Sequence, residues 1–421
     1  MSDSTSPSSA SKAMDARFTA RLKQRYASER RFRAIGLSAV VFSALMLAFL
    51  ILTMTSSAIG GFKRTELRFP IDFAQSAMPL DAAQLSAPDA RDKLKAAGLP
   101  DVIAMAASQN AGATAASEIG DGAWGEVANQ LIADPGLLKS TVEVSVPVTN
   151  DLAAAFRGEG HEELRPLAAS LAREGKLVSR LDLGFLSRSD ATDPQAVGIW
   201  GALKGSMMTM FVTLLLAFPI GVFSALYLEE YAPRSRWTDL IEVSINNLAA
   251  VPSIIFGLLG LAVFLWIFPN YRSAPLIGGM TLALMTMPVI VISGRNAIKA
   301  VPPSIRDGAL AVGASRVQTV FHHVLPLAMP GILTGTIIGM ARALGETAPL
   351  LMIGMRAFVA TPPDGFTSPS SALPVQIFLW SDEVSRGFVE RTSAAIIVLL
   401  VFLLVMNGMA IYLRNRFERR W

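Results

Sequence analysis

Two ionisable side chains, Arg342 and Glu346, lie four residues apart in the apolar stretch TIIGMARALGETAPLLMIG, residues 336–354. A charge at the centre of a lone membrane helix costs about 2.5–3.5 kcal/mol, so such residues usually face other helices or a watery cavity. At 100° per residue the two side chains lie about 40° apart on one helix face. Arginine offers a planar fork of donors that suits an oxyanion, and the Thr347 hydroxyl follows.

Three interpretations of this pair remain open. Arg342 and Glu346 could neutralise each other and hold their helix in a bundle. Arg342 could instead meet an oxyanion that crosses the membrane, with Glu346 holding the guanidinium and keeping the site weak enough for release. A proton relay is the third, although no chain of further intramembrane carboxylates accompanies the pair. Arg295, at the inner end of an earlier span, is either a charge anchor or a further pathway residue.

The helix that carries the pair also carries a small-residue repeat. Gly331, Gly335 and Gly339 recur at intervals of four on the predicted face of the pair, and such repeats let another helix approach closely. We therefore expect these glycines to pack against a helix. The opposite side, with Leu333, Ile337 and Leu344, is expected to face lipid.

The composition is that of a membrane protein: 52% of the 421 residues are hydrophobic and 17% are charged. Each long apolar run approaches the roughly 20 residues of a spanning helix, which predicts an all-α polytopic core with six transmembrane helices. The third run begins polar and contains Pro252, so its first half is expected to lie along the interface. The runs are 34–54, 206–228, 248–268, 275–294, 328–354 and 393–413.

The distribution of basic residues predicts the orientation. Eighteen lysines and arginines fall on one side, and the two short loops opposite carry four, namely Arg272, Arg356, Arg386 and Arg391. Basic residues accumulate on the cytoplasmic side, so both termini are expected in the cytoplasm. The predicted parts are a basic segment 1–33, a first span 34–55, an extracytoplasmic domain 56–205, a core of five spans 206–413 and a basic tail 414–421.

Residues 56–205 contain no spanning run and hold 14 basic and 19 acidic residues. Stretches such as ELRFPIDF and STVEVSVPV have strand character, whereas EELRPLAASLAREG has helix character. We expect a small α/β or α+β domain. Whether it is a spacer, a docking surface or a ligand site is not evident from its residues.

A compact loop, residues 301–327, joins the fourth and fifth runs. Two short helices are expected there, with a bend at Gly313, a cap at Ser315 and an end at Pro326. The loop resembles the EAA loop of ABC importer permeases, and GMARALGETAPLL is similar to the fifth-span signature of PstA-type permeases of phosphate importers. The resemblance implies that the loop docks on an ATPase. The residues that carry the loop's part of it are Asp307, Gly308, Ala309, Gly313, Leu325 and Pro326.

Several kinds of chemistry are disfavoured. The chain has no cysteine and three histidines, so a metal site is not expected. No G-x-x-x-x-G-K-[ST] motif occurs, so a partner must hydrolyse any ATP. We expect a transport subunit with no cofactor and no nucleic-acid partner, and not an enzyme.

The resemblance implies the transmembrane subunit of an ATP-driven importer for inorganic phosphate in the inner membrane of a bacterium, with 206–413 as the permease core. It also implies its partners: a second, homologous permease chain, two ATPase subunits and an extracytoplasmic phosphate-binding protein. One alternative is a permease for another oxyanion, such as molybdate or sulfate. A more distant alternative is a membrane sensor whose outer domain binds a ligand, although a sensor has little use for Arg342.

Overall fold

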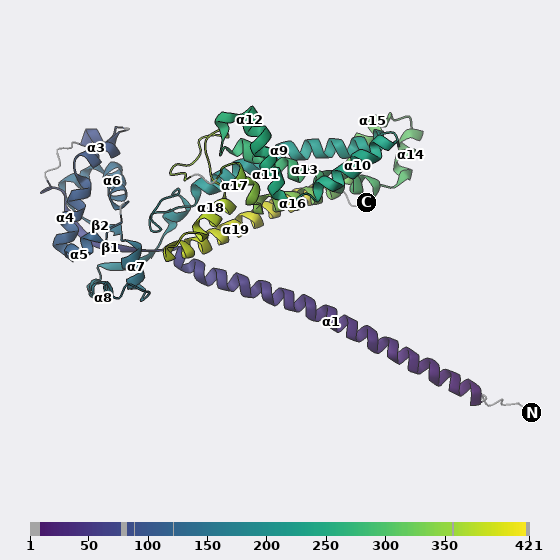
Figure 1. Ribbon diagram of the computed structural model, residues 1–421, viewed down its shortest axis with the longest axis horizontal. Coiled ribbons are helices and arrows are strands. Elements are labelled where there is room, and N and C mark those ends of the chain that lie inside the picture. Colours follow the sequence, from purple (N-terminus) through teal and green to yellow (C-terminus); the bar gives the residue numbers. More distant parts are fainter. Residues whose placement is uncertain (1–8, 77–81, 88, 121, 356–357, 418–421) are drawn as a thin grey trace, which may run out of the picture. The chain divides into compact units, whose positions relative to one another are not determined.

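The computed structural model describes residues 9–76, 82–87, 89–120, 122–355 and 358–417 (Figure 1). Arg356, Arg419 and Arg420, which enter the charge argument, lie outside the described residues. The chain divides into two compact units, Met1–Ser56 and Ser57–Trp421. Most of the first unit belongs to helix α1 (Ser9–Gly61), whose apolar side chains from Phe32 to Leu52 are exposed on all sides. A helix that is apolar all round is typical of a membrane span.

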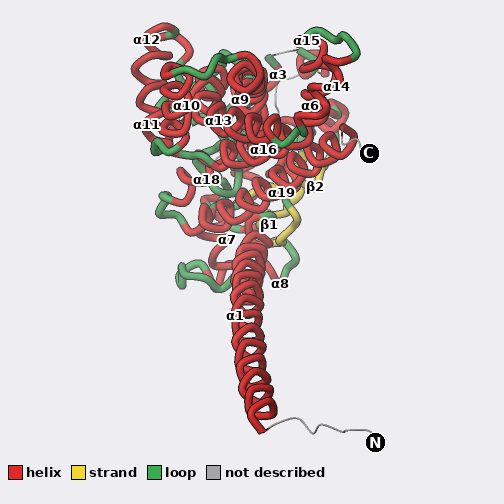
Figure 2. The backbone as a smooth tube through the Cα atoms, turned by 90° about the vertical axis from the view of Figure 1, so that its right-hand side faces the viewer, coloured by secondary structure: helices red, strands yellow, loops and turns green. Residues whose placement is uncertain are grey.

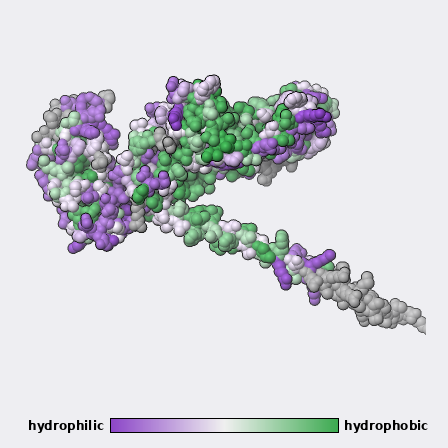
Figure 3. Space-filling view, in the orientation of Figure 1, coloured by the Kyte–Doolittle hydropathy of each residue, from purple (hydrophilic) through white to green (hydrophobic). Residues whose placement is uncertain are grey.

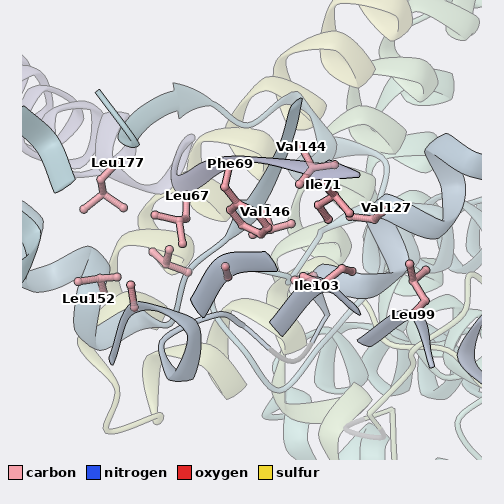
Figure 4. Packing of buried hydrophobic residues seen from close by; sticks show 14 of the residues in the cluster. Leu67, Phe69, Ile71, Leu99, Ile103, Val127, Val144, Val146, Leu152 and Leu177 are labelled. Atoms are coloured by element: carbon pink, nitrogen blue, oxygen red, sulfur yellow. The ribbon is translucent and has the colours of Figure 1, made fainter. Parts of the chain in front are cut away.

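A three-stranded antiparallel sheet forms the centre of the segment that follows α1. Its strands are β1 (Lys63–Asp72), β2 (Thr141–Pro147) and β3 (Leu177–Leu181), in the order β2-β1-β3. Phe69 of β1 is paired with Val144 of β2. Alternate β1 residues, Leu67, Phe69 and Ile71, are buried against the helices on one face of the sheet (Figure 4), as a half-buried strand requires.

Among the described residues of this segment, seven helices accompany the sheet, so the segment is α+β. They are α2 (Ala82–Leu85), α3 (Ala90–Ala96), α4 (Leu99–Ala111), α5 (Ala113–Ser117), α6 (Ala123–Ala133), α7 (Asn150–Phe156) and α8 (Arg165–Arg173), with 3₁₀ turns at Pro135–Lys139 and Leu183–Leu186. The core of this segment is separate from the apolar clusters of the later helices.

Long apolar helices make up the rest of the chain (Figure 2). They are α9 (Trp200–Leu226), α13 (Pro275–Lys299), α16 (Leu325–Gly345) and α19 (Arg386–Phe417), and hydrophobic side chains cover much of their surface (Figure 3). α13 packs against both α9 and α16. Shorter helices connect them: α14 (Pro303–Ala311), α15 (Arg316–Gln318), α17 (Ala348–Met352) and α18 (Leu373–Ser381), with turns at Tyr227–Tyr231, Pro269–Tyr271 and Thr319–Val324.

The third predicted span is a bent pair of helices. α10 (Arg236–Ala249) meets the stretch Ser253–Ile267 at 104°, and Pro252 stands at the start of the second piece. That piece comprises α11 (Ser253–Leu259), a π turn at Gly260–Phe264 and α12 (Leu265–Ile267). Within the described residues, five helices are long and apolar enough to cross a membrane, or six if the bent pair counts as one span.

The predicted bounds of the fifth span are wrong at both ends. One helix runs from Arg316 to Gly345, so Pro326 does not end a separate helix before the span. A proline cannot donate to the residue four positions earlier and its ring crowds that carbonyl. The π turn at Thr319–Val324 provides a wider turn just before Pro326. At the other end the helix stops at Gly345 rather than at 354.

Candidate functional site

Arg342 lies in the last turn of α16, and Glu346 is the first residue beyond the helix. The Glu346 backbone is extended, with φ −79° and ψ 118°. The Arg342 Nε lies 3.4 Å from Glu346 Oε1, and the two side chains are 47% and 19% exposed. The pair therefore forms across the end of a helix and not on a continuous helical face. The sequence leads to this break, because Gly345 is a weak helix former and Pro349 cannot donate a backbone hydrogen bond.

Thr347 immediately precedes α17, where its carbonyl accepts the Leu351 N–H at 3.0 Å. Thr347 and Glu346 are half-buried, next to the half-exposed Arg342. The site thus brings together a guanidinium, a carboxylate and a hydroxyl-bearing residue at the junction of α16 and α17. Leu344, expected to face lipid, is 3% exposed and packs in an apolar cluster. That expectation is wrong, because the helix turns this side chain towards the bundle.

The three repeated glycines of α16 lie against α13. A Cβ on Gly335 would stand 1.8 Å from Ser293 Oγ, and one on Gly339 would stand 2.9 Å from a Thr286 methyl group. A Cβ on Gly331 would stand 2.6 Å from that of Ala297. The stripe allows the close approach of the two helices. Leu333 and Ile337 instead line an apolar groove of about 600 Å³ between α9, α16 and α19.

Arg295, near the end of α13, is already engaged by two carboxylates. Its Nε lies 3.4 Å from Glu229 and its terminal nitrogen 2.9 Å from Glu242, and its side chain is 13% exposed. Lys299 adds a contact of 3.6 Å with Glu229. These ion pairs join the ends of α9 and α13 to α10. Within the described residues, the ion pairs of Arg295 and Arg342 share no carboxylate partner.

The loop after α13 is a structured protrusion, which we call the knob (residues 301–327). Asp307 and Gly308 are exposed on α14, whereas Ala309 is buried. Gly313 has φ +90°, a conformation that favours glycine. Its N–H donates to Leu310 and the next N–H donates to Ala309, which closes α14 as a Schellman motif.

The second half of the knob begins at a capping box. Ser315 and Gln318 exchange side-chain-to-backbone hydrogen bonds of 3.2 and 2.9 Å, which start the long helix to Gly345. Leu325 and Pro326 lie half-buried where this helix leaves the knob. The exposed tip carries four apolar side chains: Leu310, Val312, Val317 and Phe321.

Sequence reasoning missed the residue that fixes the knob. Arg306 of α14 binds Glu230 with both Nε (3.0 Å) and a terminal nitrogen (2.7 Å). Its other donors reach the carbonyls of Val301 at 2.7 Å and Ile298 at 2.9 Å. From the sequence, Arg306 is only one of the eighteen basic residues that predict the orientation. Two consecutive glutamates at the end of a span, Glu229 and Glu230, were the signal that basic partners would lie nearby.

A second missed cluster joins the α+β segment to α19. Arg391, expected in a short loop between spans, lies in the first turns of α19 and is 2% exposed. It donates to the carbonyls of Pro194 (2.7 Å) and Gly61 (2.5 Å) and to the Asp182 carboxylate (3.2 Å). Asp182 also binds Arg188 at 2.5 Å. A charge this deeply buried requires such partners. The loop position expected for Arg391 is wrong, because the helix of the last span already begins at Arg386.

The same connection contains a perturbed carboxyl group. Burial raises the pKa of Asp190, although Trp380 Nε1 donates a hydrogen bond to its carboxylate at 3.2 Å. No group of three histidine, aspartate or glutamate side chains suited to a metal ion occurs within the ranges that the structure describes.

Comparison with known proteins assigns the two halves of the chain separately. Residues 217–419 match the family described as "Binding-protein-dependent transport system inner membrane component". Residues 19–165 match a "Domain of unknown function (DUF3333)". The first match covers the end of α9, the helices α13, α16 and α19, the knob and the Arg342 site.

Three relatives are similar over about half of the chain. "Probable ABC transporter permease protein YqgI" of Bacillus subtilis is 34% identical over 48% of this chain and 68% of its own. "Phosphate transport system permease protein PstA 1" of Mycobacterium tuberculosis is 30% identical over 53% of this chain and 72% of its own. "Phosphate transport system permease protein PstA" of Mycobacterium leprae is 31% identical over 56% of this chain and 77% of its own. The chain therefore belongs to the inner-membrane permeases of binding-protein-dependent ABC importers, as a transport subunit of the PstA type and not an enzyme.

Proposed function

We propose that this permease forms one half of the transmembrane pathway of an inorganic-phosphate importer, with Arg342 as the anion contact. The observation that carries the proposal is the half-exposed guanidinium at the end of α16. Within the part of the chain that the structure describes, the Nε of Arg342 is the guanidinium nitrogen that binds Glu346, which leaves both terminal amino groups for an oxyanion. Arginine binds such groups through two parallel hydrogen bonds.

The same geometry favours release of the anion over tight binding. A half-exposed guanidinium is screened by water, and exposed ion pairs contribute about 0–1 kcal/mol. Glu346 competes with the anion for the guanidinium, and Thr347 adds a hydroxyl donor at the same junction. Arg295 would meet the anion only after its contacts with Glu229 and Glu242 open. A weak site suits a pathway from which the substrate must leave.

The proposed partners follow from the family and from the knob. Two ATPase subunits would provide the energy, one docking on the exposed Asp307 and Gly308 and on the apolar tip, while the buried Ala309 would support this surface from below. A second, homologous permease chain would complete the pathway, and an extracytoplasmic phosphate-binding protein would deliver the substrate. Closure of the ATPases would push the knob, and the continuous helix Arg316–Gly345 would carry that movement to the Arg342 site.

The proposed arrangement places both termini in the cytoplasm and residues 56–205 outside. We take the parts of the chain to be 1–33, 34–55, 56–205, 206–413 and 414–421, with the knob on the cytoplasmic side. The basic residues near the knob and the termini support this orientation. A reporter fused after Trp421 should be active only as a cytoplasmic fusion, and one inserted near Gly160 only as an extracytoplasmic one.

Substrate identity is tested by uptake in vesicles that hold the assembled importer. ATP-dependent uptake of labelled phosphate is expected, with excess unlabelled phosphate as the competitor. Molybdate and sulfate should compete weakly. Stronger competition by either of them than by phosphate would replace phosphate with that oxyanion and leave the permease assignment intact.

A further inference from the structure

Three exposed leucines lie next to the point where the α+β segment joins α19. We propose that Leu181, Leu183 and Leu186, together the leucine edge, insert among the lipid acyl chains of the adjacent bilayer leaflet. Their exposed fractions are 65%, 67% and 41%. The α+β segment would then touch the membrane with its own surface, in addition to its covalent links to α1 and α9.

The local backbone turns these leucines outwards as a set. Leu181 ends β3, and Leu183 and Leu186 are the first and last residues of a 3₁₀ turn. Residues three apart in such a turn lie on the same side. The residues between them point inwards: Asp182 is 6% exposed and Phe185 is fully buried.

Contacts with the ends of the spanning helices fix the position of this turn relative to the bilayer. The Asp182 N–H donates to Phe62 at 2.7 Å, and its carboxylate accepts from Arg391 of α19. Phe185 lies 5.2 Å from the Arg391 guanidinium and belongs to one apolar cluster with Ala394 and Ala395. These alanines stand at the start of the apolar run of α19. The leucine edge therefore begins where the hydrocarbon-facing surface of the spans begins.

Exposed basic residues accompany the leucines. Lys63 is the register partner of Leu181, and Arg180 precedes it. Both side chains are exposed, and neither has a carboxylate within 4 Å in the described part of the chain. Leucines beside lysine or arginine are typical of surfaces that enter the boundary between acyl chains and anionic headgroups. This combination favours lipid over a protein partner as the occupant.

The absence of cysteine from the chain makes a direct test possible. Leu183→Cys in the full chain provides a single attachment site for a nitroxide spin label. The labelled protein would be placed in bilayers of phosphatidylethanolamine and phosphatidylglycerol. Collisions of the label with oxygen, which concentrates in lipid, would be compared with collisions with a water-soluble nickel chelate.

Met105→Cys is the matched control, because Met105 is also apolar and 65% exposed. It lies on α4, which packs against β1, α3, α5 and α6. The ratio of oxygen to nickel collisions should be several-fold higher at 183 than at 105. Leu186→Cys provides a second site on the same side, with the same expectation, should the first variant fold poorly.

Two results would overturn the proposal. Equal access of the nickel chelate to positions 183 and 105 would mean that the leucine edge lies in water. Protection of position 183 from both reagents would mean that protein covers it, as a second permease chain would. Neither result bears on phosphate as the substrate.

Discussion

At the scale of the residue, the end of α16 explains how the chain tolerates Arg342. A guanidinium in the last turn of a helix lies near unpaired carbonyls and the negative end of the helix dipole. Glu346, just beyond the helix, adds a carboxylate at 3.4 Å. The cost estimated for a charge at the centre of a continuous membrane helix does not apply, because α16 stops at Gly345.

Arg342→Gln should lower phosphate uptake by up to about fivefold, because an exposed charged contact contributes up to about 1 kcal/mol. Membrane insertion and binding of the ATPases should be unchanged. Initial uptake rates in vesicles with matched protein amounts measure the effect. Arg234→Gln, which removes an exposed arginine outside the helices, is the control. Normal uptake by the Arg342 variant would remove this residue from the pathway.

At the scale of the element, the knob is rigid because both of its halves are terminated by specific hydrogen bonds. The Schellman motif at Gly313 ends α14, and the capping box at Ser315 begins the next helix. The connection between them is therefore short and ordered. Such a connection can transmit a displacement to the helix that ends beside Arg342.

Gly313→Val should uncouple ATP hydrolysis from transport. Nothing lies within 4 Å of a Cβ at this position, but φ is +90°, so the expected cost is backbone strain of about 1–3 kcal/mol. The ratio of ATP hydrolysed to phosphate imported should rise. Gly313→Asn is the control, since asparagine tolerates positive φ and should preserve the ratio. An unchanged ratio in the valine variant would show that the bend is not needed for coupling.

Packing between α13 and α16 depends on a single side of each helix. Gly335→Ala should destabilise the assembled protein by about 1–3 kcal/mol, the usual range for overpacking, because its Cβ would overlap Ser293. Thermal denaturation in detergent measures this. Ser293→Gly in the same chain should restore stability, and Gly408→Ala, which meets no atom within 4 Å, should have little effect. Failure of Ser293→Gly to restore stability would contradict this packing.

At the scale of the whole molecule, two arginines join parts that are far apart in the sequence. Arg306 fixes the knob to the ends of α9 and α13, and Arg391 fixes the α+β segment to α19. Both side chains combine a carboxylate with backbone carbonyls. Movement of either part therefore has to involve the helix to which its arginine is bound.

Arg306→Gln should reduce phosphate imported per ATP hydrolysed, while the knob still docks on the ATPases. Glutamine cannot reproduce the two-point contact with Glu230 or cap both carbonyls. Parallel measurement of ATPase activity and uptake distinguishes this outcome from loss of assembly. Arg316→Gln, an exposed residue of the same knob, should leave the ratio unchanged. Equal coupling in both variants would exclude Arg306 as a positioning residue.

Arg391→Met should lower the free energy of unfolding by about 3–5 kcal/mol, because removing one partner of a buried ion pair leaves the other charge uncompensated. The contact between Asp182 and Arg188 would soften this loss towards the lower value. Thermal denaturation in detergent measures it, with the exposed Arg173→Met as the control. If Arg391→Met lowers the stability no more than Arg173→Met does, the cluster around Arg391 does not hold the α+β segment against α19.

The sequence by itself determined which runs are apolar, the family resemblance, the bend at Gly313 and the small-residue stripe of α16. These are local properties, because hydrophobicity, glycine content and motif spacing act over a few residues. The mixture of strands and helices in 56–205 could be anticipated for the same reason. The pair Arg342 and Glu346 was found from its spacing alone.

Only the tertiary structure decided where these elements stop and what they touch. The break at Gly345, the unbroken passage through Pro326 and the burial of Leu344 depend on neighbouring helices as well as on local preference. The carboxylate partner of Arg306 lies 76 residues away in the sequence, and the partners of Arg391 lie up to 330 residues away. Spacing within one helix carries no information about such contacts, since they arise only when distant segments pack and bury each other's charges.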